Sequence, residues 1–395
     1  MILPEKVEKI LQKLNDAGFE AYIVGGCVRD CLLKREPQDW DITTSAEPQE
    51  VKKIFHRTYD TGLKHGTVTV LLEKERYEIT TYRIDKEYQD CRHPSEVIFT
   101  KSLKEDLQRR DFTINAMAYH PKKGIQDYFE GQTHLEQKII QGVGNAKKRF
   151  QEDALRMLRA LRFSAQLGFQ IEQKTYQALQ EQKKLIQNIS AERIHEELEK
   201  MLQAAYLENI NLLWQSGLLN EISPLLYQKI LQKGETIIQE LKKAPFDRII
   251  RWTIFLQELT PKEGEQFLKE LRFDNDTIKL VVSLLEHLKD TIPLEEYAIR
   301  KKAYEITAEQ LKRLFLIQGQ KKDTTEWQSC LDKILERGDC ITLKTLAVTG
   351  NDLQKNKIVK EGKEVGAMLS FLLDIVHREP EKNTKQILLY YAKQK

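Results

Sequence analysis

The chain has 395 residues, of which 31% are charged and 41% hydrophobic, and its formal net charge is only +3. No stretch approaches the roughly 18 apolar residues of a membrane-spanning helix. The N-terminus mixes acidic and basic side chains where a signal peptide has an apolar run. We therefore expect a cytoplasmic protein without a membrane partner. The five cysteines lack the pairing of a disulfide framework or a zinc site, and the weak net charge means that any nucleic acid is held by local basic patches.

The first motif is a glycine pair between an apolar strand and a helix. The pattern predicts a helix over residues 3–17, a strand over residues 21–24 and a second helix over residues 28–33. The glycines at 25–26 let backbone N–H groups approach phosphate oxygens, and the helix that follows turns its positive end toward the same anion. The guanidinium group of Arg29, at the start of that helix, can donate paired hydrogen bonds to the same phosphate. Such an arrangement suits a nucleoside triphosphate.

Two carboxylates follow at a spacing that suits divalent cations. If residues 39–43 form a strand, Asp39 and Asp41 point to one face while Trp40 and Ile42 point to the other. Mg2+ prefers oxygen ligands, and two-metal phosphoryl transfer uses carboxylates that the two ions share. Taken alone, the glycines are compatible with an ordinary turn and the acidic pair with a solvated loop. Their combination resembles the signature of the nucleotidyltransferase superfamily that includes DNA polymerase β.

A helix and a hairpin are expected next. Residues 47–55 predict a helix with Ser45 as its N-cap, and residues 67–72 and 76–83 predict two strands joined by a charged turn. On the second strand, Glu78 is a candidate third carboxylate, which assists a metal ion or accepts the proton of an attacking hydroxyl. The alternative is a surface glutamate on a half-buried strand.

Two polar segments follow the hairpin. Residues 85–94 are turn-prone and lack periodicity, which predicts a mobile loop that can act as a lid. Further along, Arg109, Arg110 and Asp111 precede a mixed apolar segment. Arg110 is a candidate clamp for a triphosphate or a ribose, with Asp111 orienting it. The alternative is a capping or surface ion pair at the start of a helix.

From residue 149 onward the pattern is helix after helix. Residues 150–167 predict a single helix whose apolar stripe lies opposite an arc formed by Arg156, Arg159 and Arg162. Asp153 and Arg156 are three positions apart, which places their tips side by side on such a helix. Because aspartate accepts hydrogen bonds and arginine donates them, this pair matches the amino donor and ring acceptor that cytosine and adenine share. An ordinary surface ion pair is the alternative.

With these motifs in place, the chain resembles the bacterial class II tRNA nucleotidyltransferases, the CCA-adding enzymes, and their relatives the poly(A) polymerases. The matching segments are GGCVRD with DWD, YEITTYR, RRDFTINAMA, DYFEGQ, EDALRMLRALRF and ISAERIHEELEKML, in the family's order within about the first 205 residues. Later, LAVTGNDL followed by VGAML resembles the tail of the Bacillus-type enzymes. Residues 362–364 depart from the Gly-Pro that the family usually has before the Val-Gly pair.

The resemblance implies an α+β fold, with a polymerase β-like mixed α/β head followed by helical parts. The implied parts are a catalytic head at 1–141, a neck at 142–205, a body at 206–299 and a tail at 300–395. Body and tail are implied to grip the acceptor arm and elbow of tRNA. The basic runs at 300–302 and 355–363 are candidates for that contact.

The resemblance also assigns roles to single residues. Three carboxylates form the catalytic cluster, of which the first two hold Mg2+: Asp39, Asp41 and Glu78. Seven residues contact bound ATP or CTP, the first three at the triphosphate or sugar and the others around the base: Gly26, Arg29, Arg110, Asp153, Arg156, Arg159 and Arg162. The implied reaction is the addition of CCA to the 3' end of tRNA without a template.

Three alternatives stay open at this point. A poly(A) polymerase would share the head and neck, and an enzyme restricted to adding CC or A would share the whole architecture. A protein that binds RNA without catalysis would keep the fold, although the intact carboxylates argue against it. The sequence also leaves open whether two copies form a homodimer.

Overall fold

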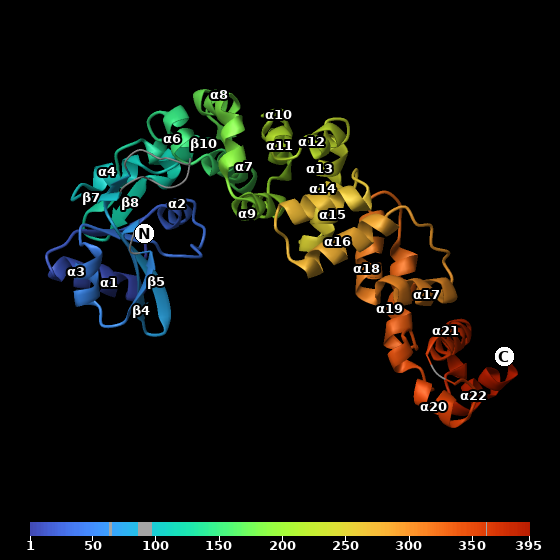
Figure 1. The fold of residues 1–395 in the computed structure, drawn as a ribbon. Coiled ribbons are helices and arrows are strands. Elements are labelled where there is room, and N and C mark those ends of the chain that lie inside the picture. Colours follow the sequence, from blue (N-terminus) through green and yellow to red (C-terminus); the bar gives the residue numbers. More distant parts are fainter. Residues whose placement is uncertain (63–64, 86–96, 361) are drawn as a thin grey trace. The chain divides into compact units, whose positions relative to one another are not determined.

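The computed structural model describes residues 1–62, 65–85, 97–360 and 362–395. The chain divides into two compact units, Met1–Ile238 and Gln239–Lys395. The first unit begins with a mixed α/β region and continues as helices, whereas the second unit is helical (Figure 1). The predicted α+β class is therefore confirmed. The predicted division into four parts is finer than these two units and stays a prediction.

A seven-stranded mixed sheet forms the centre of the α/β region, in the order β3-β4-β5-β2-β1-β8-β9. Its strands are β1 Ala21–Val24, β2 Ile42–Thr44, β3 Thr58–Gly62, β4 Thr67–Leu72, β5 Glu75–Thr81, β8 Met117–His120 and β9 Gly124–Asp127. β2 and β5 run parallel to each other, and β1 is antiparallel to both of its neighbours. Two small ladders join β6 Arg83–Asp85 to β7 Val97–Phe99 and β10 Ile139–Ile140 to β11 Gln170–Ile171.

The β4–β5 hairpin is closed by a two-residue turn. Glu73 and Lys74 both have positive φ angles, 49° and 72°, as in the turn whose twist matches that of paired strands. The register places Thr69 opposite Glu78 and Tyr59 of β3 opposite Thr69. The two strands predicted from the sequence are thus confirmed, and one row of side chains crosses three neighbouring strands.

Helices cover the two faces of the sheet unequally. α1 Glu5–Asp16 and α3 Pro48–Ile54 pack on one face, where buried residues such as Ile10 and Val51 meet Ile23 and Ile79 (Figure 1). On the other face, α4 Leu103–Gln108 covers only part of the sheet, with Leu107 packed against the strands. The uncovered part of that face carries polar side chains.

One predicted cap is wrong. α3 begins at Pro48 with Glu47 as its N-cap, and the Glu47 N–H donates to Glu50 Oε2 at 2.7 Å. Ser45 instead accepts a hydrogen bond from the Glu20 N–H through its Oγ at 2.9 Å, which ties the chain after β2 to the chain before β1. Ser45 therefore connects the segments beside β1 and β2 and does not cap α3, because Glu47, which is closer to the helix, forms the capping box.

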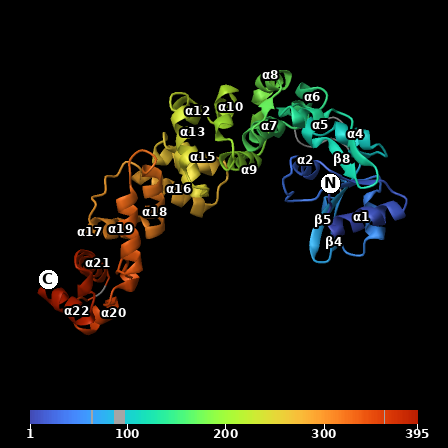
Figure 2. The ribbon, with the colours of Figure 1, turned by 180° about the vertical axis from the view of Figure 1, so that it is seen from behind.

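The remaining helices continue the chain through both units, and Figure 2 shows them from behind. Those of the first unit are α2 Gly26–Leu32, α5 Gly131–Glu136, α6 Ala146–Glu152, α7 Leu155–Leu167, α8 Gln173–Gln182, α9 Ala191–Leu202, α10 Leu212–Gln215, α11 Leu218–Ile222 and α12 Pro224–Ile230. α13 Gly234–Lys243 spans the border. The short 3-10 turns of this unit are Thr113–Asn115, Lys183–Asn188 and Leu207–Asn211.

The second unit contains α14 Arg248–Leu256, α15 Pro261–Glu270, α16 Asn275–His287, α17 Glu296–Ile306, α18 Ala308–Gln318, α19 Thr325–Glu336, α20 Gly350–Lys355, α21 Lys363–Arg378 and α22 Lys385–Gln394. Its 3-10 turns are Leu343–Thr345 and Pro380–Lys382. A separate apolar cluster at its C-terminal end includes Leu353, Leu372 and Leu388. None of the helices in the described part of the chain combines the length and apolar character needed to span a bilayer.

Candidate active site

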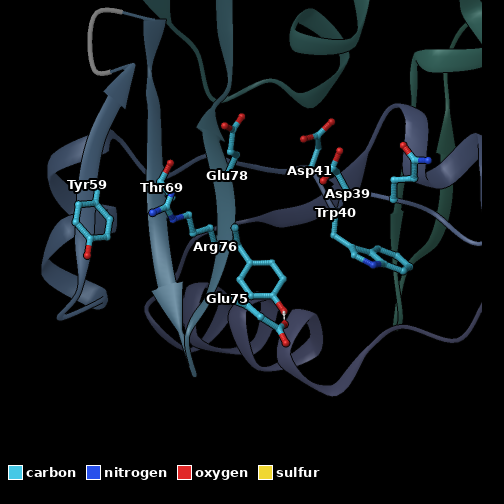
Figure 3. Close-up of a pocket in the computed structure, with 10 residues that line it drawn as sticks. Asp39, Trp40, Asp41, Tyr59, Thr69, Glu75, Arg76 and Glu78 are labelled. Carbon is cyan, nitrogen blue, oxygen red and sulfur yellow. Dashed lines mark hydrogen bonds between the residues drawn. The ribbon is translucent and has the colours of Figure 1, made fainter. Parts of the chain in front are cut away.

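Three carboxylates meet on the open face of the sheet. β2 pairs with β5 so that Ile42 lies opposite Ile79, which makes the preceding residues, Asp41 and Glu78, neighbours. Figure 3 shows Asp39, Asp41 and Glu78 pointing in the same direction, and all three line one cavity of about 810 Å³. The sequence prediction that these side chains converge is therefore confirmed.

The predicted strand over residues 39–43 is only partly correct, because β2 begins at Ile42. Trp40 nevertheless packs on the apolar core of the opposite face, so the alternation that places Asp39 and Asp41 together holds in the segment before the strand. Partial desolvation raises the pKa of Asp41, the nearby Arg110 lowers it, and the charge of Asp39 raises it again. Desolvation is the largest of these effects, so the net shift of the Asp41 pKa is upward.

Gly25 brings the backbone against an arginine beside these acids. Its φ of 80° and ψ of −129° belong to a region that residues with a Cβ rarely adopt. A Cβ at this position would lie 2.9 Å from Arg110 Nη1. The Val24 N–H donates to the Asp41 carbonyl at 3.0 Å, so the glycine turn and the acidic segment are directly connected.

Arg110 is held in this position by a carboxylate that the sequence prediction missed. Asp106 is fully buried, accepts from Arg109 at 2.8 Å and from Arg110 at 3.4 Å, and has Thr43 Oγ1 at 3.3 Å. Burial raises the pKa of Asp106, but Arg109 and Arg110 lower it further, so that the net shift is downward. The spacing of Asp106 from both arginines, three and four positions along α4, is the signal that would have found it.

The predicted pairing of Arg110 with Asp111 is wrong. The arginines follow the end of α4, with Arg109 as its C-cap, and do not stand at a helix start. Asp111 instead bonds Arg159, at 2.7 and 2.8 Å. Arg110 Nε is buried and has no hydrogen-bond partner among the described residues. One donor of this guanidinium is therefore neither solvated nor hydrogen-bonded to a described residue.

Arg29 is built into the protein interior. It is 9% exposed and donates to Asn115 Oδ1 at 2.6 Å and to Asp30 at 2.9 and 3.0 Å. Its guanidinium also lies 5.1 Å from the centre of the Phe163 ring. Gly26 packs beside it, since a Cβ there would lie 3.7 Å from Arg29 Nη2. Arg29 therefore joins α2 to the segment before β8 and to α7.

The single helix predicted over residues 150–167 is wrong. α6 ends at Glu152, α7 begins at Leu155, and Asp153 between them has extended backbone angles. Its Oδ1 accepts from the Leu155 N–H at 3.1 Å, which links the end of α6 to the first residue of α7. Its carboxylate also pairs with Arg193 of α9, at 2.8 and 3.2 Å. Aspartate competes with helical hydrogen bonds in this way, which hydrophobic periodicity does not reveal.

Arg156 does not pair with Asp153. Its guanidinium donates to Glu152 at 2.8 Å and to the backbone carbonyls of Arg109, at 2.8 Å, and Arg149, at 3.2 Å. The side chain is therefore buried between α7 and the chain that follows α4. The structure brings Arg156 close to the Arg110 segment, but not in the geometry that the sequence predicted.

The predicted arginine arc is also turned inward. Arg162 is 7% exposed and bonds Glu197 at 2.5 Å, while Arg159 reaches Asp111. Both guanidinium groups lie near the Phe163 ring, at 5.3 Å for Arg159 and 4.0 Å for Arg162. Burial raises the pKa of Asp111, yet Arg159 and other cations lower it to a value far below its usual range. Arg159 therefore connects α7 to the segment after α4, and Arg162 connects α7 to α9.

Basic residues in the second unit were expected to face RNA, and part of that expectation is wrong. Arg300 is 2% exposed and pairs with Asp339 at 2.8 Å. Lys302 is 9% exposed and pairs with Asp290 at 2.7 Å. Both cations stabilise the interior of their own unit. In the other predicted run, Lys355, Lys357, Lys360 and Lys363 are exposed.

The acidic cavity suits Mg2+ by its donor set. Within the described ranges no group of three or more histidine, cysteine, aspartate or glutamate side chains is placed so that it could hold a metal ion. Mg2+ does not require one, because it is usually bound by one or two carboxylates together with substrate phosphates and water. Asp39 and Asp41, two carboxylates that line the same cavity, fit that role. The predicted loop at 85–94 lies almost entirely outside the described residues.

A mixed sheet with clustered carboxylates, a glycine turn and an arginine beside them defines a polymerase β-like nucleotidyltransferase. Residues 21–141 match the family model of the poly(A) polymerase head domain, residues 168–230 that of a probable RNA- and SrmB-binding site of polymerase A, and residues 247–392 that of tRNA nucleotidyltransferase domain 2. The CCA-adding enzyme of Pediococcus pentosaceus is 38% identical over 98% of this chain and 96% of its own length.

Two solved structures of CCA-adding enzymes are similar in fold to this chain. The Bacillus stearothermophilus CCA-adding enzyme in complex with CTP has a TM-score of 0.84 and 31% identity, covering 100% of this chain and 98% of that chain. The Thermotoga maritima CCA-adding enzyme complexed with tRNA shares the fold, with a TM-score of 0.64 and 20% identity over 98% of this chain and 96% of that chain. The chain belongs to the CCA-adding enzyme family of tRNA nucleotidyltransferases.

Proposed function

We propose that this enzyme adds CCA to the 3' end of tRNA, using CTP and ATP without a template. The observation that carries the proposal is the convergence of Asp39, Asp41 and Glu78 in one cavity, with the guanidinium of Arg110 close enough to act on the charge of Asp41. Relatives of nearly full length that are CCA-adding enzymes support the choice of reaction. The Bacillus relative solved with CTP supports the nucleotide.

In the proposed reaction, the primer's 3' hydroxyl attacks the α-phosphate of the bound nucleotide. The new bond joins the 3' oxygen to the α-phosphorus, the bond to the β-phosphate oxygen breaks, and pyrophosphate leaves. Glu78 accepts the hydroxyl proton, directly or through water. Gly26 and Arg110 face the triphosphate, and Arg29 fixes α2 beneath it. Mg2+ ions held by Asp39 and Asp41 would stabilise the charge on the reacting phosphate.

Base selection is assigned to Asp153 and Arg156, with Arg159 and Arg162 around the same nucleotide. For the first pair to read a base edge, Asp153 must exchange Arg193 for the amino group of cytosine or adenine. Arg156 must likewise exchange a backbone carbonyl for the ring nitrogen. Guanine and uracil present a donor where the arginine needs an acceptor, so they are rejected.

The partner is proposed to be tRNA, gripped at its acceptor arm and elbow by the body and tail. The Thermotoga relative with the same fold, solved with tRNA, supports this, as does the exposed lysine run at residues 355–363. The proposed head, neck, body and tail are residues 1–141, 142–205, 206–299 and 300–395. A cytoplasmic location follows from the proposed substrate.

The test is a nucleotide-addition assay with purified protein, Mg2+ and a tRNA transcript that lacks its 3' CCA. Products that end in CCA and grow no further establish the proposal. Long A tails would identify a poly(A) polymerase, and addition of A only to CC-ended tRNA would identify an A-adding enzyme. Asp41→Ala should keep the fold and tRNA binding but lose addition, whereas Asp60→Ala, at an exposed site, should retain it. Addition by Asp41→Ala would refute the metal assignment.

A further inference from the structure

The acidic cavity extends well beyond the three carboxylates. It also runs along the β3–β4–β5 surface, where Tyr59, Thr69 and Arg76 line it. The strand registers place Tyr59 opposite Thr69 and Thr69 opposite Glu78, so these side chains form one row across the sheet. Figure 3 shows Tyr59 and Arg76 on the side of Glu78 away from Asp39 and Asp41. The reaction proposed above assigns no role to this part of the cavity.

The phosphate-binding groups lie on the other side of the acids. Arg110 packs against Gly25 and influences Asp41, and β1 and β2, which flank them, are on the opposite side of β5 from β4 and β3. In an in-line displacement the attacking and leaving oxygens lie on opposite sides of the phosphorus. If pyrophosphate leaves toward Arg110, the attacking hydroxyl must arrive from the side of Glu78 and Thr69.

Two side chains on that side are available to a ligand. Tyr59 is 53% exposed, so its ring is accessible to a ligand. Arg76 is exposed as well and makes no ion pair with a described residue. Glu75 also lines the cavity, but its carboxylate is already bound to Lys6 and Tyr77, at 2.6 Å each, which reduces its repulsion of a phosphate.

We propose that this row is the subsite for the 3'-terminal nucleotide of the RNA primer, in which Tyr59 stacks on the base and Arg76 contacts its phosphate. Tyr59 lies two strands from Glu78, about 10 Å across the sheet, so a nucleotide whose 3' hydroxyl is at Glu78 extends toward the ring. Stacking on an aromatic ring tolerates every base. The subsite therefore accepts the successive primer ends that growth of CCA produces. The inference rests on the proposed function.

The test compares steady-state addition of the first C by the full-length enzyme and by the variants Tyr59→Ala, Tyr59→Phe and Arg76→Gln. Tyr59→Ala should lower kcat/KM for the tRNA primer on the order of 10- to 100-fold, the usual loss for a stacked base, and leave the KM for CTP unchanged. Tyr59→Phe should retain most activity because it keeps the ring. Tyr128→Ala, at another exposed tyrosine of the same unit (46% exposed), is the matched control.

Two further readouts separate contact with the primer from a structural effect. With a primer whose 3'-terminal nucleotide lacks a base, wild type and Tyr59→Ala should become equal within about twofold. Arg76→Gln should reduce the salt dependence of primer binding by about 0.7 in log–log slope, the contribution of one phosphate contact on a single strand. Lys53→Gln, which removes a charge from the exposed side of α3, should leave the slope unchanged.

The outcomes distinguish the two proposals. If wild type adds no nucleotide to any tRNA, the proposed function fails and the subsite fails with it. If wild type adds CCA while Tyr59→Ala and Arg76→Gln match their controls, the function stands and the subsite is refuted. A loss for Tyr59→Ala that persists with the abasic primer would also refute stacking. Thermal unfolding of each variant identifies any that is misfolded, and Tyr59→Phe then decides through its retained activity.

Discussion

Asp106 is predicted to hold the nucleotide side of the site together. Its carboxylate is fully buried, while the side chains of its partners Arg109 and Arg110 are only 17% and 20% exposed. Replacing it by asparagine keeps the shape and removes the charge, so two adjacent guanidinium groups lose their counter-ion. Breaking a buried ion pair by removing one partner costs about 3–5 kcal/mol. Because both arginines are partly exposed to solvent, we expect a loss in the free energy of unfolding at the lower end of this range, about 3 kcal/mol.

Native-state hydrogen exchange read by mass spectrometry measures this cost locally, which matters because unfolding of a chain with two units is not a single transition. A loss of about 3 kcal/mol corresponds to roughly 100-fold faster exchange, in peptides that cover α4 and β2, the strand that Asp106 contacts through Thr43. Exchange in the second unit should not change. A higher KM for CTP should accompany the change, because Arg110 is no longer fixed beside Asp41.

The control is Asp60→Asn, which removes a carboxylate that is 47% exposed and lies 2.9 Å from Lys52. Exposed pairs contribute less than about 1 kcal/mol, so its exchange should stay within a few-fold of wild type. If Asp106→Asn behaves like this control in both exchange and KM, the ion pairs around Asp106 do not support the site, and the reasoning is refuted.

Three other predictions follow from the same structure. Gly25→Ala should lower the free energy of unfolding by about 1–3 kcal/mol through backbone strain and weaken CTP binding by displacing Arg110. Gly124→Ala, with a φ of 72° but open space around it, should lower stability without changing CTP binding. Equal CTP affinity in the two variants would contradict this. Folding lowers the pKa of Asp111, so its carboxylate contributes fully to stability above about pH 5, where the unfolded carboxylate is ionised, and contributes less as the pH falls below about 4. The stability of Asp111→Asn should therefore fall less steeply with decreasing pH than that of wild type. An unchanged dependence of stability on pH would contradict this. Asp153→Ala should admit UTP and GTP in the addition assay while pyrophosphate release continues, and unchanged rejection of both would remove Asp153 from base reading.

The acidic cluster was predictable because it depends on short-range geometry. Alternation along the chain directs Asp39 and Asp41 to one face whether or not the segment counts as a strand. Glu78 joins them through a parallel strand pair whose register is determined by burial of Ile42 and Ile79. Two local patterns and one apolar face were therefore enough to place three carboxylates.

The helical part of the site was not predictable in the same way. Asp153 and Arg156 have the spacing of a helical pair, but Asp153 pairs instead with Arg193, which lies 40 positions away. Arg159 likewise finds Asp111 across 48 positions. Periodicity reports which face of a helix is apolar, and it contains no information on which distant charge will meet an arginine on the other face.

The charges of the α/β region separate groups that support the fold from those that act on a ligand. Asp106 and Asp111 are buried, yet guanidinium groups lower the pKa of each below its usual value, so folding itself supplies their compensation. Asp41 has Arg110 nearby, but burial and Asp39 outweigh it and raise the pKa. A carboxylate that the fold leaves under-compensated gains most from a bound cation. Arg110, whose side chain is 20% exposed, supplies a positive charge beside Asp41, so the two residues are complementary to the two charges of a metal-bound nucleotide.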